Sequence, residues 1–517
     1  MQKHTGLRLR MPAAALLLAL ALSLFPGAAR QTAAQGLATG CAAAAFFDPD
    51  SLEEAFGLSF RTEPAGSLEE AFRAAWSAVS LDGIRHLVFC LDGSESASGY
   101  SALLPTSADN VEKIGQLDLY AARYGGYFAE ESEVFRLDGR SSAVSCVRQL
   151  KTLCDAKGVG FTLLFLPLHE SRLRSLDQSD LLRYKKSLAS VCDLWDFSRS
   201  ALSADMRYFY TKDCARTSTL DMVLRRIAGE DVPAESFGVR VTAARAETQL
   251  AAVQSAPLPE SDGGYTCRVP ILLYHNITEN PVSRADISPA AFRSHMEALC
   301  AAGYTAVTAA DLIAYVEQGV PLPEKPVWIT FDDGYLSNYT IAFPILRELG
   351  MRATVFAIGV SIGKSTYKDT GYAITPHFSQ AQAREMTASG VMEIQSHTWD
   401  LHQYAPFEPD PAAARTTALP LPGESSESFL AALRADYAAY QAAWGNGFYA
   451  LAYPKGQYTA DSEALFRSLG VRLTVSTTTD RQNILIQGLP QSLSALCRFD
   501  IPEGMTPEAL LALLETE

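Results

Sequence analysis

Short apolar runs alternate with helical patterns along the second half of the chain. The strand-like runs lie at 269–274, 326–331, 352–358, 391–396, 447–453, 470–476 and 494–500. Between them, apolar residues recur at three-and-four spacing, which predicts helices at 289–302, 308–317, 340–349, 379–389, 427–444 and 459–468. Strands and helices that alternate in this way over about 250 residues predict a closed or nearly closed β/α barrel.

The region before this barrel shows a similar alternation. Apolar strands are predicted at 84–91, 161–168 and 191–197, with helical patterns between them. This order predicts a three-layer α/β domain with a mostly parallel sheet over residues 37–230. Residues 231–265 carry prolines, glycines and an Ala/Glu/Gln stretch, so we interpret them as a linker to a second domain at 266–517. The Ala/Glu/Gln stretch within this linker could be helical.

The first 34 residues have the pattern of a secretory signal peptide. Lys3, Arg8 and Arg10 precede an apolar run from Met11 to Leu24, and small residues follow it. The run is short for a spanning helix, which needs about 20 residues. We therefore predict a secreted or cell-envelope protein, with an uncleaved signal anchor as the alternative and no other strong membrane association.

Composition narrows the classes of partner. The 517 residues have a formal net charge of −15, which argues against nucleic acid as the main partner and against docking on anionic lipid. A neutral glycan is not excluded by this charge. The nine cysteines form no C-x-x-C pair, and their pairing cannot be specified from the sequence.

The candidate chemistry lies at two strand ends. Residues 327–331 form an apolar strand that runs into Asp332, Asp333 and a glycine, and residues 393–396 run into His397 and His402. Successive residues at a strand end point in different directions, so one aspartate can hold a metal while the other faces a reacting atom. Two imidazoles and one carboxylate leave coordination positions open, as catalytic metal sites require. We predict Asp333, His397 and His402 as ligands and Asp332 as the general base.

Three motifs carry a resemblance to a known family. Residues 330–334 read T-F-D-D-G, residues 396–402 read S-H-T-W-D-L-H, and residues 452–456 read A-Y-P-K-G. In this order, residues 266–510 resemble the polysaccharide deacetylases, the NodB-homology group of carbohydrate esterase family four. The resemblance implies a distorted β/α barrel, a divalent metal and hydrolysis of N-acetyl groups on a glycan that contains N-acetylglucosamine. Zn is the first choice of metal, and Co, Ni or Mn also suit the ligands.

Two departures from the family pattern concern catalysis. Many members place an arginine in the third motif, where this chain has none, and Arg498 after the last strand is the candidate to replace it. Many members carry a late acid histidine, whereas this chain has no histidine after His402. The segment 270–275, P-I-L-L-Y-H, resembles the permuted branch that includes poly-N-acetylglucosamine deacetylases, in which the acid histidine follows the first strand. That resemblance implies His275 as the general acid.

Further residues flank these motifs. The resemblance places oxyanion contacts near Tyr453 and Pro454, while Tyr335 and Trp399 are predicted either to stack on sugar rings or to pack in the barrel rim. Two polar insertions, 361–378 and 404–426, follow strands on the same face and are candidate rims of a substrate groove.

Three segments of the N-terminal domain follow one another as L-L-F-L-P-L-H (163–169), D-L-W-D-F-S (193–198) and Y-F-Y (208–210). In this order they weakly resemble SGNH-type hydrolases linked to polysaccharide acylation. A nucleophile at Ser94 or Ser96 would lack its base, because cysteine stands where that family has histidine. His169 after a strand is the other candidate base. We therefore predict a catalytically degenerate domain that binds glycan.

The predicted function is an exported, metal-dependent glycan N-deacetylase. The alternatives are an O-acetyl esterase of the xylan type and a non-catalytic carbohydrate-binding or assembly protein. The motifs do not separate N-acetyl from O-acetyl substrates.

Overall fold

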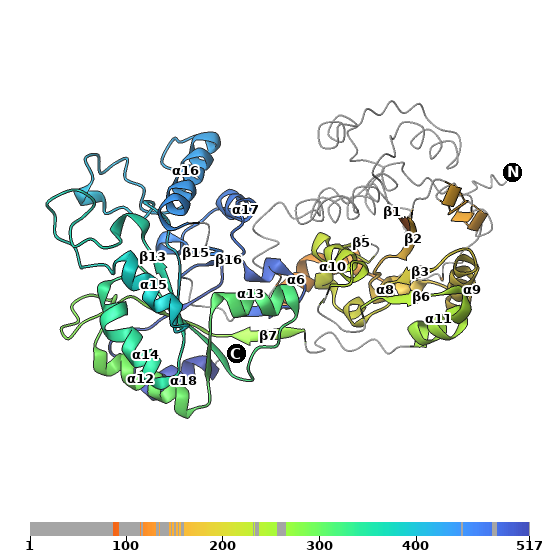
Figure 1. Cartoon of the computed structure of the whole chain (residues 1–517), viewed down its shortest axis with the longest axis horizontal. Helices are drawn as coiled ribbons and strands as arrows, with labels where there is room; N and C mark the ends of the chain where they lie inside the picture. The colour runs from red at the N-terminus through yellow and green to blue at the C-terminus, as the bar shows by residue number, and fades with distance from the viewer. Residues whose placement is uncertain are drawn as a thin grey trace. The chain divides into compact units, whose positions relative to one another are not determined.

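The computed structural model describes residues 86–91, parts of 114–156, and residues 160–515 apart from 213, 231, 233–236, 256–264, 446–447 and 478–482. The chain divides into two compact units that meet in sequence between Tyr265 and Thr266 (Figure 1). The predicted signal peptide at 1–34 and the candidate nucleophiles Ser94 and Ser96 lie outside the described residues. In the part of the chain that is described, no helix is long and apolar enough to cross a bilayer.

A curled parallel sheet forms the centre of the C-terminal unit. Its strands follow the order β16-β15-β14-β13-β12-β8-β18. Their bounds are β8 (Ile271–Tyr274), β12 (Pro326–Phe331), β13 (Ala353–Ala357), β14 (Met392–Ser396), β15 (Ala450–Ala452), β16 (Leu473–Val475) and β18 (Phe499–Asp500). A short β11 (Thr305–Val307) pairs with the first half of β12. A parallel bridge between Val475 and Leu496 joins the β16 edge to the segment that leads into β18. The sheet thus curls toward closure, and the prediction of a distorted β/α barrel is confirmed.

Helices cover the outside of this sheet. In Figure 1, α12 (Pro289–Ala301), α14 (Phe343–Leu349) and α18 (Pro507–Glu515) lie side by side, and α12 contacts both of the others. Ser288 caps α12 by accepting a hydrogen bond from the N–H of Ala291, and Pro289 occupies its first turn. The remaining large helices are α13 (Ala309–Gln318), α15 (Gln380–Ala388), α16 (Ser426–Trp444) and α17 (Ala460–Ser468).

Backbone hydrogen bonds between neighbouring strands continue past the strand ends and position the first residue of each loop. The N–H of Asp332 donates to the carbonyl of Tyr274 (3.0 Å), and the N–H of His397 donates to the carbonyl of Ala357 (3.0 Å). All six residues of β12 are buried, which anchors the strand that ends at Asp332. The carboxyl ends of parallel strands meet at one edge, so these residues lie together.

The N-terminal unit contains a four-stranded sheet in the order β1-β2-β3-β6. Strands β1 (His86–Leu91), β2 (Gly160–Phe165) and β3 (Leu194–Asp196) are parallel, and β6 (Val239–Val241) is antiparallel to β3. This confirms the prediction of a mostly parallel sheet. Helix α11 (Ala246–Ser255) contacts α9 (Gln178–Ala189) and buries Leu250 and Val253.

The predicted linker at 231–265 is too long, because part of it belongs to the N-terminal unit. Within it, residues 239–255 supply an edge strand and a packed helix to the N-terminal unit. The helix agrees with the possibility that the Ala/Glu/Gln stretch is helical, whereas the edge strand was not predicted, because it buries only one side.

Candidate metal and catalytic site

Residues with left-handed backbone conformation (positive φ) follow two of the strands and orient the side chains of the site. Asp333 has φ 69° and Gly334 has φ 86°, so the chain reverses directly after Asp332. A Cβ on Gly334 would lie 3.0 Å from the Cβ of Ala357, and a side chain there would disturb β13. Thr398 after β14 also has φ 69°. Left-handed backbone at residues other than glycine costs about 1–3 kcal/mol and concentrates at functional sites.

Asp333, His397 and His402 form a cluster of metal-ligand type. Their ligand atoms all lie within 4.8 Å of one another, and His397 Nε2 is 3.6 Å from Asp333 Oδ1. His397 Nδ1 lies 2.8 Å from the carbonyl of Ala452. That contact assigns the ring hydrogen to Nδ1 and leaves Nε2 to bind a metal. Burial lowers the pKa of His402, which keeps it in the neutral form that binds metals.

The carboxylate of Asp333 also fits a cation. Its Oδ1 is buried and has no hydrogen-bond partner among the described residues. A buried carboxylate oxygen without a partner is costly unless it binds a cation. The donor set of two imidazoles and one carboxylate therefore suits a divalent metal.

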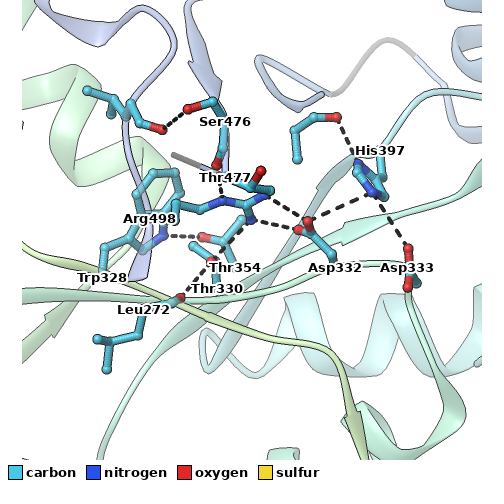
Figure 2. A network of polar contacts seen from close by, with 12 residues as sticks. Leu272, Trp328, Thr330, Asp332, Asp333, Thr354, His397, Ser476, Thr477 and Arg498 are labelled. Carbon is cyan, nitrogen blue, oxygen red and sulfur yellow. Dashed lines mark hydrogen bonds and ion pairs between the residues drawn. The ribbon is translucent and has the colours of Figure 1, made fainter. Parts of the chain in front are cut away.

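Asp332 is held by Arg498 in a bidentate ion pair (Figure 2). Arg498 Nη1 and Nη2 lie 2.7 Å from Oδ1 and Oδ2 of Asp332, and Arg498 Nε donates to the carbonyl of Ser476 at 2.7 Å. Both side chains are almost fully buried. Burial raises the pKa of Asp332, but the Arg498 guanidinium and the neighbouring His397 and His275 together outweigh burial, so the pKa lies well below its usual range. The carboxylate is therefore ionised and oriented.

We expect Arg498→Lys to move the acid limb of the rate–pH profile to higher pH. A single ammonium cannot reproduce two parallel hydrogen bonds, so the pKa of Asp332 rises toward its usual value and ionisation needs a higher pH. Misplacement of the base lowers kcat/KM by about 100-fold. Profiles of kcat/KM against pH test this, with metal content as the control. An acid limb at the wild-type pH would contradict it.

His275 follows β8 at the same edge of the sheet. Its carbonyl accepts a hydrogen bond from Asn338 Nδ2 (2.9 Å), in a π-helical turn (Asn338–Ala342). Burial raises the pKa of Asp333, but the neighbouring His402, His275 and His397 lower it below its usual value. His275 thus lies within electrostatic reach of the predicted metal ligand.

The rings of Tyr335 and His377 contact each other beside Asp333. The charge of Asp333, together with burial and a hydrogen bond to that carboxylate, raises the pKa of Tyr335. His377 is 8% exposed, and its ring centroid lies 5.1 Å from that of Tyr335. His377 was not predicted as a site residue, because a histidine at the end of a Pro-bearing insertion follows no strand and has no periodic context.

Asp436 is a second residue that the sequence did not indicate. Its carboxylate accepts the N–H groups of Trp399 (2.8 Å) and Asp400 (2.7 Å), which holds the turn between the two histidines. Burial raises the pKa of Asp436 to about 7. In the sequence it is one charged position of helix α16, and nothing marks it as buried.

Three other predicted site residues have structural partners. The hydroxyl of Tyr453 donates to Glu463 Oε2 (2.6 Å) and its N–H to the carbonyl of Val475 (3.1 Å), so its N–H is not free for an oxyanion. Pro454 is buried beside it and has no N–H. The ring of Trp399 packs on Gly359, where an added Cβ would lie 2.2 Å from Cε3. That contact favours rim packing over sugar stacking for Trp399.

His169 in the N-terminal unit has the surroundings of a packing residue. Its ring lies between Phe128 (4.7 Å between centroids) and Phe209 (5.6 Å), and Nδ1 is 2.9 Å from Ser171 Oγ. Burial lowers the pKa of His169 to about 4.

Known proteins resemble the C-terminal part of the chain. Residues 319–474 match the polysaccharide deacetylase family. YxkH of Bacillus subtilis, which is classed with these deacetylases, is 28% identical over 253 residues, 48% of this chain and 77% of that protein. The poly-beta-1,6-N-acetyl-D-glucosamine N-deacetylase of Escherichia coli is 32% identical over 25% of this chain and 20% of its own length. The enzyme of that name from Staphylococcus epidermidis is 34% identical over 22% of this chain and 36% of its own length.

Among solved structures, IcaB from Ammonifex degensii aligns with a TM-score of 0.39 at 26% identity and covers 48% of this chain and 97% of its own. The barrel, its strand-end carboxylates and its histidines define a hydrolase domain. The C-terminal unit contains a polysaccharide deacetylase domain, as the family match over residues 319–474 shows. The chain spans less than half the length of the poly-N-acetylglucosamine enzymes that it matches.

Proposed function

We propose that this protein is an exported, metal-dependent deacetylase that removes N-acetyl groups from a glycan containing N-acetylglucosamine. The observation that carries this proposal is the ionised Asp332, clamped by Arg498 beside the Asp333–His397–His402 cluster. The names of the matched relatives support the substrate class. Zn is the proposed metal, and Co, Ni or Mn would suit the same ligands.

The residues divide the reaction between them. A divalent cation held by Asp333, His397 and His402 would polarise the acyl carbonyl and lower the pKa of the attacking water. Asp332 takes the proton of that water, in an orientation maintained by Arg498. His275 gives a proton to the nitrogen of the leaving amine, which departs as the C–N bond breaks. For the N-terminal unit we propose a non-catalytic, glycan-binding role; the packing of His169 between two phenylalanine rings supports only the non-catalytic part of this proposal.

Acetate release from N-acetylglucosamine oligomers tests the proposal. The full chain is assayed as purified, after chelation, and after addition of Zn or Co. We expect release that stops on chelation and returns with metal. Release from acetylated xylan alone would replace the proposal with an O-acetyl esterase. Bound metal without release from any substrate would favour a binding protein.

We expect His275→Gln to retain metal and fold but to lower kcat by about 100-fold or more, because glutamine cannot donate a proton to the leaving amine. The basic limb of the kcat–pH profile should disappear as well. An enzyme with wild-type rate and an unchanged basic limb would remove His275 as the acid.

A further inference from the structure

The two insertions that rim the site are joined to each other. Lys368 in the first insertion forms an ion pair with Asp400 (2.8 Å), which precedes the second insertion, and another with Glu408 inside it. The hydroxyl of Tyr367 also donates to Glu408 and accepts the N–H of Tyr404 (3.2 Å). These contacts hold the two loops in one arrangement.

Three aromatic rings lie together at this junction. The rings of Tyr372 and Phe407 stack with 4.4 Å between centroids and 12° between planes, and Tyr404 meets Phe407 edge-on at 4.7 Å. Tyr372 is 51% exposed and Tyr404 54% exposed. They are the two most exposed aromatic side chains in the described part of the C-terminal unit. We refer to Tyr372, Tyr404 and Phe407 as the aromatic platform.

The platform adjoins the proposed metal cluster through both loops. Tyr404 is two residues beyond His402, so their Cα atoms are at most about 7 Å apart. The other loop ends at His377, whose ring contacts Tyr335 beside Asp333. The two loops that carry the exposed rings therefore also carry His377, or begin directly after His402, beside the proposed metal cluster.

We propose that the aromatic platform binds a pyranose ring of the glycan adjacent to the sugar that is deacetylated. This inference rests on the proposed function. An exposed apolar patch beside a catalytic site marks a binding surface, and aromatic faces contribute contact area at little entropic cost. The ionic groups that join the two loops are Lys368, Asp400 and Glu408, which together carry a charge of about −1 at neutral pH. The platform thus suits a neutral or aminated sugar chain rather than an acidic one, and an oligomer rather than a monosaccharide.

Chain-length dependence in the full chain tests the platform. Tyr372→Ala and Tyr404→Ala are compared with wild type on N-acetylglucosamine oligomers from the disaccharide to the pentasaccharide, and on 4-nitrophenyl acetate. We expect kcat/KM for the pentasaccharide to fall about three- to tenfold for each variant, the range that one aromatic contact supplies. Turnover of the small ester and metal content should be unchanged. Tyr372→Trp should retain the wild-type value.

Val282→Ala is the matched control, because Val282 is 91% exposed in the same unit and outside the platform. Equal rates for wild type and both tyrosine variants on the pentasaccharide would overturn the platform. An equal loss on the small ester would also overturn it, since that loss would lie in the reaction itself. If the wild type releases no acetate from any oligomer, the proposed function fails. The platform is then tested by calorimetric measurement of affinity for the pentasaccharide. Weaker binding by the two tyrosine variants would support the platform as a sugar-binding surface, and equal binding would contradict it.

Discussion

Asp332→Asn is expected to reduce kcat by about 1,000-fold or more while the metal stays bound. An amide has no basic oxygen that can take the proton of the attacking water, and general base catalysis contributes about 10²–10⁴-fold. Asparagine keeps the volume of the side chain and one oxygen for Arg498, but it removes the countercharge of a fully buried guanidinium. Loss of one partner of a buried ion pair costs about 3–5 kcal/mol, so we also expect a lower unfolding free energy.

Three measurements on the same preparation separate these effects. They are acetate release, metal content and denaturant unfolding. Asp333→Asn is the matched control, because the adjacent amide substitution should lose metal instead of retaining it. A variant of Asp332 that keeps a tenth of the wild-type kcat would remove Asp332 as the base.

His397→Ala should abolish both metal binding and turnover. His397 Nε2 lies 3.6 Å from Asp333 Oδ1, and two remaining ligands hold a divalent cation poorly. Changing a residue that only supports a ligand already costs about 10–100-fold in metal affinity, so loss of the ligand itself should cost more. Metal analysis and titration calorimetry with Zn measure this directly.

The control is His295→Ala, a deletion of another buried histidine. His295 Nε2 lies 2.8 Å from the carbonyl of Met505, and Nδ1 lies 3.3 Å from the hydroxyl of Tyr274. We expect this variant to be less stable but to keep its metal. Stoichiometric metal in purified His397→Ala protein would exclude His397 as a ligand.

The sequence by itself determined the order and type of most barrel elements, but it did not indicate the short strand β11. Each of the seven predicted strands contains a strand of the sheet, because local periodicity reports which residues are buried. The motifs at 330–334 and 396–402 also placed Asp332, Asp333 and His397 at strand ends and His402 just beyond one. Strand ends of a parallel sheet share one edge, so the sequence already implied that these residues meet.

The tertiary structure alone decided how this site is completed. The sequence named Arg498 as the candidate arginine, but its contact with Asp332, 166 residues away, depends on the curled sheet that brings the last strand beside β8. His377 and Asp436 come from an insertion and an outer helix, and the N–H of Tyr453 is taken up by Val475. The pairing of Tyr372 with Phe407 depends on two loops that no periodicity describes. Contacts of this kind follow from chain closure and loop packing, which local sequence patterns do not encode.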